Sequence, residues 1–259
     1  MTRFLIVLFL ISRVPTGLAQ EIKLYELGAP QIKQLYDVET GKFSGPPGEW
    51  VQYMDRINGG WTTDQGILSA IIDSGVSSSH PLIAPVLVES IDLTGEGPED
   101  RVGHGTFVAL ISLSMGEPSP LISIKVFGDK VAGNGAKRLE RALRLAAARG
   151  AKIANLSVGV DLMCANSRDP DPPQDLVSCE ETSLCRTVTE VTREPGLLVV
   201  AAVGNDPTTT GCPACCKDAL AVGGAGPEGQ RSPNSGQFAD ILAPNSVPLV
   251  ELGTAQVPK

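Results

Sequence analysis

Residues 136–158, AKRLERALRLAAARGAKIANLSV, hold a helical pattern, a turn and a strand pattern in direct succession. Apolar side chains recur at the three- and four-residue spacing of one helical face, at Leu139, Ala142, Leu143 and Ala146. Gly150 follows, where glycine is typical of a helix end, and the apolar run 153–158 predicts a buried strand. This stretch therefore predicts a helix that packs back on a sheet.

The same alternation of strands and helices continues on both sides of this stretch. Further strands are predicted over 68–72, 121–127, 197–202, 219–222 and 241–243. Helices are predicted over 107–115 and around Leu184, Val188 and Val191, before the breaker Pro195-Gly196. Strands that alternate with helices need crossover connections, which favours a mostly parallel sheet with helices on both faces. The predicted fold class is therefore α/β, with three layers.

Size, composition and charge set the first limits on function. The chain has 259 residues, of which 42% are hydrophobic and 19% charged, so one full-sized globular core is expected. Its formal net charge is −8, and no run of lysine or arginine is present. An acidic surface repels phosphate groups, so nucleic acid is not an expected partner.

The N-terminus has the layout of a secretory signal peptide. Arg3 precedes an apolar run, 4–11, and Gly17-Leu18-Ala19 offers a cleavage site with small residues. The run is too short to span a bilayer. The alternative is a buried N-terminal strand or helix. We predict a signal peptide over 1–19, an N-terminal arm over 20–49 and one domain over 50–259. The protein is then secreted, extracellular or periplasmic, and not bound to a membrane.

All six cysteines lie in one segment of the chain, at Cys164, Cys179, Cys185, Cys212, Cys215 and Cys216. In an exported protein an even number of clustered cysteines favours disulfide bridges, whose pairing the sequence leaves open. The alternative is a zinc site around the Cys212-x-x-Cys215 pair. The remaining cysteines contain no second pair of this tight spacing, and export also favours bridges, so no metal site is predicted.

Polar residues follow three of the predicted strands, at Asp73, Ser157 and Asn205. The carboxyl ends of parallel strands meet at one edge of a sheet, where ligands bind in open α/β folds. His104 begins a predicted helix and is expected at the same edge. The cysteine-bearing loops follow the strands that end at Ser157 and Asn205, so bridges there are expected to flank the same cleft.

These segments together resemble the subtilisin-like serine peptidases, the subtilase or peptidase S8 family. The likeness covers roughly residues 50 to 250, in the order of that family. Its motifs are AIIDSGVSSSHPLI (70–83), DRVGHGTFVALI (100–111), IKVFGDKVAGNG (124–135), ANLSVG (154–159), VVAAVGN (199–205), CPACCKDALAVGG (212–224) and FADILAP (238–244).

The resemblance implies a role for each polar residue at the predicted sheet edge. His104 is the expected general base, and Asp73 holds its ring in the required tautomer. Gly103 and Gly105 are expected to leave the ring accessible to substrate. The alternative for His104 is a helix-capping histidine with no chemistry, which its pairing with Asp73 disfavours. Asp73 alone, without the histidine, would be interpreted as a turn cap. Asn205 is the expected donor to the oxyanion of the reaction intermediate.

Two further segments, Gly133-Asn134-Gly135 and Ser157-Val158-Gly159, match those that bind the substrate backbone in this family. The resemblance therefore implies polypeptide substrates, a monomeric enzyme and no cofactor. Structural calcium occurs in the family, but the sequence locates no site for it.

The sequence also departs from the family pattern. Phe107 stands where a second histidine is usual, and no Gly-Thr-Ser nucleophile motif is present. Gly253-Thr254-Ala255 mimics this motif with alanine in place of serine, but it comes too early in the chain and no predicted helix follows it. We expect a serine endopeptidase domain that is truncated before its serine, and no turnover from these 259 residues. The alternative is a naturally short pseudopeptidase that binds peptides or a partner protein. A metal-dependent hydrolase built on Asp73 and His104 ranks last, because further ligands are missing.

Overall fold

The computed structural model describes residues 67–244, apart from 115–118, 131–132, 167 and 227–228, together with two short strands nearer the N-terminus. These strands, β1 (Tyr36–Asp37) and β2 (Lys42–Phe43), pair antiparallel within the predicted arm. The predicted signal peptide and Gly253-Thr254-Ala255 lie outside the described residues.

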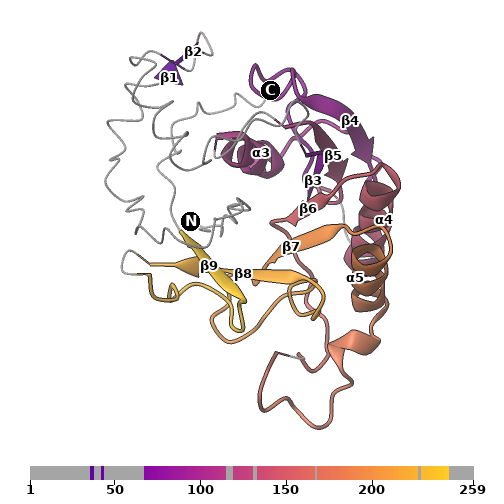
Figure 1. The fold of residues 1–259 in the computed structure, drawn as a ribbon, viewed down its shortest axis with the longest axis vertical. Coiled ribbons are helices and arrows are strands. Elements are labelled where there is room, and N and C mark those ends of the chain that lie inside the picture. Colours follow the sequence, from indigo (N-terminus) through magenta and orange to yellow (C-terminus); the bar gives the residue numbers. More distant parts are fainter. Residues whose placement is uncertain are drawn as a thin grey trace.

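A seven-stranded sheet forms the centre of the fold (Figure 1), and all its strand pairs are parallel. The spatial order is β4 (Leu87–Asp92), β5 (Leu121–Lys125), β3 (Ser69–Asp73), β6 (Ile153–Leu156), β7 (Leu198–Ala202), β8 (Leu220–Ala225) and β9 (Ile241–Pro244). The predicted α/β fold with a parallel sheet is confirmed.

Helices cover both faces of this sheet, as predicted (Figure 1). Helix α3 (His104–Ser114) lies on one face, and α4 (Gly135–Ala148) and α5 (Ser183–Arg193) lie side by side on the other. Alternate side chains of β3 explain this arrangement. Ile71 packs in the core beneath α3, whereas Ile72 belongs to the core beneath α4 and α5. Both faces of the central strands are therefore buried, as expected of parallel strands.

Helix α4 shows how the opening stretch determines this packing. The four predicted apolar positions are the buried ones in the helix, at Leu139, Ala142, Leu143 and Ala146. Gly150 follows with φ 79°, the left-handed conformation that glycine adopts at low cost, and the chain turns there into β6. Among the described residues, no helix is long and apolar enough to cross a membrane.

Strand β4 was absent from the prediction. Its sequence, LVESID, carries two acids, and five of its six side chains are partly buried. The reason is its place at the edge of the sheet, where β5 is its only partner in the strand order. The hydrophobic run that marks a central parallel strand is therefore not required.

Candidate active site

The carboxyl end of β3 and the start of α3 bring Asp73 and His104 together. Asp73 is the last residue of β3 and His104 the first of α3, and Oδ1 of Asp73 lies 2.7 Å from Nδ1 of His104. The aspartate side chain is fully buried, and that of the histidine is 9% exposed. An ionised carboxylate only accepts hydrogen bonds, so Nδ1 carries the proton in this pair and Nε2 is the basic nitrogen.

The surroundings of His104 favour its protonated form. Burial lowers the pKa of the imidazole, but the hydrogen bond from Nδ1 to Asp73 and the negative charges of Asp73 and Asp100 outweigh it, so that the pKa of His104 lies above its ordinary value of 6.5. A base whose cation is stabilised in this way accepts a proton from a substrate or nucleophile readily.

Asp100 holds the start of α3 against β3, a role that the sequence reading missed. Its Oδ1 accepts from the hydroxyl of Ser74 at 2.8 Å and from the backbone N–H of Gly103 at 2.8 Å. Its Oδ2 accepts from the backbone N–H of Thr106 at 2.8 Å and from the hydroxyl of the same residue at 2.6 Å. Ser74 in turn accepts from the N–H of Gly105 at 2.9 Å. The signal that could have revealed this role is an aspartate just before a predicted helix.

The two glycines that flank His104 each have a structural role that was not predicted. Gly105 is buried, and a Cβ added there would lie 2.1 Å from the carbonyl oxygen of Gly75 and 3.0 Å from Cβ of Asp73. Because Gly105 has no side chain, the start of α3 can approach the end of β3 closely. Gly103 has φ 87° and open space around it, so it serves the turn into the helix. The expectation that both glycines leave the ring accessible to substrate stays a prediction.

A cleft of about 470 Å³ adjoins His104. Of the two predicted segments, Ser157, Val158 and Gly159 line it, and Gly135 lines it from the start of α4. The predicted oxyanion donor Asn205 lines it too. Gly133 and Asn134 are exposed and are not among the lining residues. The structure thus gathers the predicted residues at one edge, except for those two.

The wall of the cleft opposite His104 is a short antiparallel pairing of backbone. The N–H of Val160 donates to the carbonyl of Cys212 at 2.9 Å, and the N–H of Cys212 donates to the carbonyl of Val160 at 3.0 Å. Val160 and Gly211, the neighbour of Cys212, both line the cleft. The cysteine region is therefore continuous with this wall, which we call the bridged wall (residues 159–160 and 211–212).

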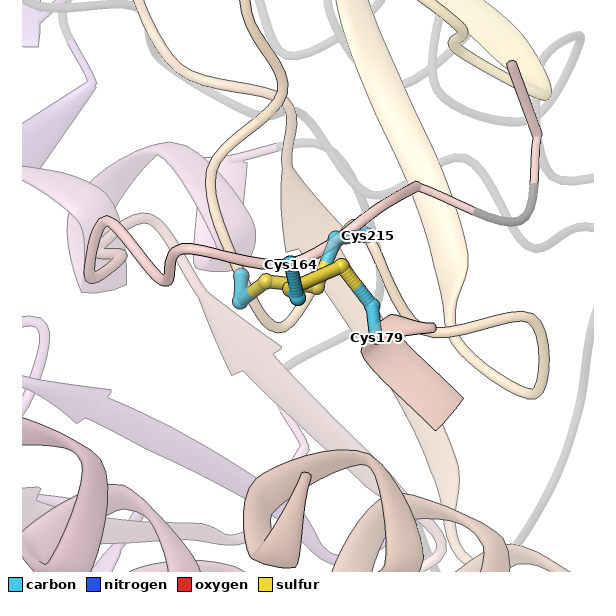
Figure 2. Close-up of side chains that lie close together, drawn as sticks. Cys164, Cys179 and Cys215 are labelled. Carbon is cyan, nitrogen blue, oxygen red and sulfur yellow. A yellow bond between two sulfur atoms is a disulfide. The ribbon is translucent and has the colours of Figure 1, made fainter. Parts of the chain in front are cut away.

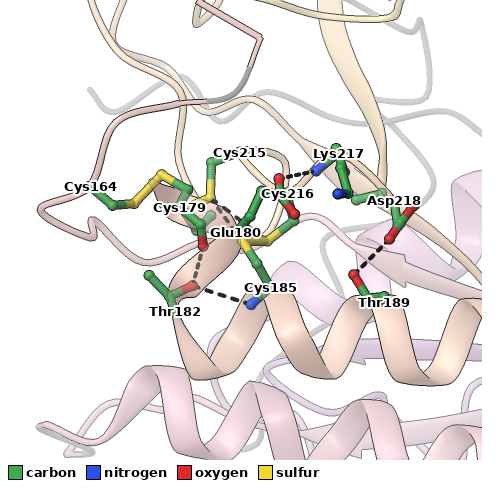
Figure 3. The surroundings of a disulfide bond; sticks show 12 residues. Cys164, Cys179, Glu180, Thr182, Cys185, Thr189, Cys215, Cys216, Lys217 and Asp218 are labelled. Atoms are coloured by element: carbon green, nitrogen blue, oxygen red, sulfur yellow. Dashed lines mark hydrogen bonds between the residues drawn. A yellow bond between two sulfur atoms is a disulfide. The ribbon is translucent and has the colours of Figure 1, made fainter. Parts of the chain in front are cut away.

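The predicted disulfide bridges are present, and the structure supplies their pairing. The bridges join Cys164 to Cys179, Cys185 to Cys216, and Cys212 to Cys215. The prediction that the cysteines lie in two loops is only partly right. Cys185 lies in α5 and Cys179 begins the 3-10 helix η2 (Cys179–Glu181). Figure 3 shows the bridge from Cys185 of α5 to Cys216 in the loop after β7, and the bridge from Cys179 of η2 to Cys164 in the loop after β6.

The described serines near the C-terminal end are engaged in other contacts. The hydroxyl of Ser235 accepts from the N–H of Gly224 at 2.9 Å and donates to the carbonyl of Gly236 at 3.3 Å. Neither Ser232 nor Ser235 lines the cleft beside His104. These two hydroxyls are therefore held by the fold rather than offered to the histidine.

Comparison with known proteins gives a consistent family. The sequence profile of the subtilase family matches residues 64–257. The thermophilic serine proteinase of Bacillus sp. (strain AK1) is 25% identical over 214 residues, which are 77% of this chain and 48% of the relative. The nisin leader peptide-processing serine protease NisP of Lactococcus lactis subsp. lactis is 32% identical over 158 residues, 52% of this chain and 22% of the relative.

Solved structures agree with the sequence comparison. The crystal structure of the nisin leader peptidase NisP superposes with a TM-score of 0.58 at 26% identity, covering 76% of this chain and 65% of that one. A cold-adapted subtilisin-like serine proteinase shares the fold, with a TM-score of 0.56 at 21% identity over 70% of this chain and 63% of its own. The chain spans about half the length, or less, of the curated relatives. The chain belongs to the subtilase family.

Proposed function

We propose that this chain carries the acid–base pair and the oxyanion donor of a secreted serine endopeptidase. The observation that supports this function is the 2.7 Å contact between Asp73 and His104 at a cleft that Asn205 also lines. Three residue types that acyl transfer requires thus converge on one site. The proposed substrates are polypeptides, bound along Ser157-Val158-Gly159 by backbone hydrogen bonds.

The proposed mechanism assigns one step to each residue. Nε2 of His104 takes the proton of a serine hydroxyl while the oxygen attacks the scissile carbonyl, and Asp73 stabilises the imidazolium that forms. The side-chain amide of Asn205 donates to the oxyanion of the tetrahedral intermediate. The imidazolium then protonates the leaving amine, and water hydrolyses the acyl-enzyme by the same route. The serine itself must come from outside these 259 residues, because they contain no Gly-Thr-Ser.

A fluorophosphonate probe tests this proposal, because it labels only an activated serine. We expect no labelling of the 259-residue chain and stoichiometric labelling of a version extended along its reading frame. In the extended protein, His104→Ala should abolish labelling, and Asn205→Ala should lower kcat by about 100- to 1,000-fold. Labelling of the short chain that His104→Ala removes would show that the nucleophile is misplaced.

The absence of Gly-Thr-Ser also favours a second candidate, a pseudopeptidase that binds peptides without cleaving them. This candidate predicts that the extended version remains unlabelled while the chain still binds peptides in the cleft. Fluorescence anisotropy with a labelled peptide library measures that binding, and Gly159→Val, which fills the cleft wall, serves as the non-binding control. Labelling of the extended protein would exclude this candidate.

A further inference from the structure

The six cysteines form a single buried group of sulfur atoms, which we call the cysteine cluster (164, 179, 185, 212, 215 and 216). Five of the six side chains are at most 2% exposed, and Cys164 is partly buried. Figure 2 shows Cys164, Cys179 and Cys215 converging from separate segments of the chain. Sulfur atoms of different bridges are also close together: the Sγ atoms of Cys215 and Cys185 are 3.7 Å apart.

Four of these sulfurs have the arrangement of a metal site. The Sγ atoms of Cys164, Cys179, Cys212 and Cys215 all lie within 4.8 Å of one another. A tetrahedral zinc ion with Zn–S bonds of about 2.3 Å separates its sulfurs by about 3.8 Å. Once the two bridges are opened, movements of about 1 Å or less therefore suffice to surround an ion. We propose that the reduced chain binds one zinc ion through these four thiolates, as a structural site.

The fold supplies the second pair of neighbouring cysteines that the sequence spacing lacks. Cys212-x-x-Cys215 is one tight pair, and the sequence offers no second one. The structure makes the second pair from Cys164 and Cys179, whose Cα atoms are 4.8 Å apart although 15 residues separate them. Two such pairs are the usual composition of a closed zinc site with four cysteine ligands.

Hydrogen bonds hold both pairs in place without the bridges. The first pair is held where the N–H of Cys179 donates to the carbonyl of Ala165 at 2.8 Å. The second is held by the two hydrogen bonds between Cys212 and Val160. Figure 3 shows a further link between the segments, where the N–H of Lys217 donates to Glu180 at 2.8 Å. The ligands are therefore arranged before the ion binds, which reduces the ordering that binding requires.

The charge of the proposed site has a compensating cation nearby. Four thiols lose four protons on binding, so the zinc tetrathiolate carries a net charge of −2. The guanidinium of Arg168 is bound to the same loop, where Nη1 donates to the carbonyls of Ala214 at 2.7 Å and Cys216 at 2.8 Å. Its side chain is only 13% exposed and also pairs with Asp240 at 3.0 Å, so the proposed site shares this cation with a carboxylate.

The third bridge is not needed for this site. Cys185 and Cys216 form a smaller group with Cys215, and this group offers only three sulfurs. Structural zinc sites are almost always four-coordinate, so the set of four is preferred. Cys185 and Cys216 are then expected to remain a bridge or a pair of free thiols beside the occupied site.

Cobalt substitution of the full 259-residue chain tests the proposal. A phosphine reduces the bridges, each consuming one phosphine and one water and yielding two thiols and a phosphine oxide. After anaerobic desalting, Co²⁺ is titrated while the absorption of tetrahedral cobalt thiolate is recorded. We expect saturation at about one cobalt per chain and loss of the signal when zinc is added. The double variant Cys185→Ala/Cys216→Ala, the matched control, should retain the signal, and Cys164→Ala should lose the tetrathiolate spectrum.

Alkylation mapping tests the same site without any substitution. Zinc should slow the reaction of iodoacetamide with Cys164, Cys179, Cys212 and Cys215 of the reduced chain, and should leave the rates at Cys185 and Cys216, which are buried in either case, unchanged. A zinc-dependent slowing at Cys185 and Cys216 instead, or a full cobalt signal in Cys164→Ala, would overturn the proposal. A reduced chain that shows no cobalt signal, folded or unfolded, would overturn it too. Refolding of the reduced chain on addition of zinc would support it.

Discussion

The two walls of the cleft are held by different kinds of interaction. On the side of β3 and α3, the carboxylates of Asp73 and Asp100 accept the hydrogen bonds, and no cysteine is present. On the opposite side, the bridged wall is tied by Cys212 to a cluster of three disulfides. In the proposed mechanism, the first wall contains the group that gains and loses a proton, His104. The second contains only backbone that must keep its shape.

This difference indicates a division of work within one cleft. A hydrogen-bonded carboxylate network adjusts the pKa of its members, because charge and solvation change together. A disulfide carries no charge and does not titrate, so it fixes a loop without altering the electrostatics of the neighbouring site. In the proposed mechanism, the disulfides therefore position one wall of the cleft. The hydrogen bonds to carboxylates on the other wall support proton transfer.

The largest effect is expected in the cysteine cluster behind the bridged wall, where the costs of removing the bridges should follow loop length. Replacing each bridged pair by alanines should cost about 4 kcal/mol for Cys185–Cys216, about 3 for Cys164–Cys179 and about 2 for Cys212–Cys215, since chain entropy grows with the closed loop. The separations are 31, 15 and 3 residues. Urea denaturation of the three double variants measures this order. The reverse order would mean that native contacts, rather than chain entropy, account for the stability.

On the hydrogen-bonded wall, the largest effect is expected at Gly105. An added methyl group would meet the backbone oxygen of Gly75 at 2.1 Å, and backbone cannot move aside as a side chain can. Gly105→Ala should cost about 3 kcal/mol, at the upper end of overpacking effects. Gly103→Ala is the matched control, with open space and a cost of about 1 kcal/mol from its positive φ alone. Equal melting temperatures for the two variants would contradict the close approach of α3 to β3.

A smaller loss is expected from Asp100→Ala. The substitution removes the acceptor for the N–H groups of Gly103 and Thr106, and the variant should be less stable by about 2 kcal/mol. The adjacent Arg101→Gln is the control, because Arg101 is exposed and its substitution should change stability by less than about 0.5 kcal/mol. Thermal unfolding of both variants compares them. If Asp100→Ala had the same melting temperature as the unaltered chain, the hydrogen-bonded wall would not depend on the hydrogen bonds of Asp100.

The smallest effect concerns pH and the two histidines. Because Asp73 and Asp100 raise the pKa of His104 above 6.5 despite its burial, its contribution to stability is complete below pH 6.5 and is lost as the pH rises through the folded pKa. Burial lowers the pKa of His80, whose contribution is instead lost as the pH falls below 6.5. Imidazole NMR titration should show these opposite shifts.

Two variants separate the two histidines. In Asp73→Asn, the pKa of His104 should fall and the decline in stability above pH 6.5 should disappear. In His80→Gln, that decline should persist, since His80 acts in the other window. An unchanged His104 titration in Asp73→Asn would contradict the assignment of Asp73 as the group that favours the imidazolium.

The sequence was sufficient where burial imposes a pattern. Helix α4 and strands β3 and β7 were found because their buried side chains recur at fixed spacing. The edge strand β4 escaped, because partial burial tolerates its acids. The residues of the candidate site were predicted from their motifs. The role of Asp100 was not predicted, because it depends on a turn that brings its carboxylate within hydrogen-bond distance of two hydroxyls and of backbone N–H groups. The pairing of the cysteines also requires the fold, since six cysteines allow 15 pairings.

The cleft lies at the carboxyl ends of the strands, which leaves the turns at their amino ends available for engineering. The turn at Gly150 and the exposed turn 194–196 both lead into the amino ends of strands, β6 and β7, whereas the cleft lies at their carboxyl ends. Exposed turns of this kind are the usual sites where inserted domains are tolerated. A fluorescent protein or an affinity module fused into either turn should report on this molecule while the groups around His104 remain undisturbed.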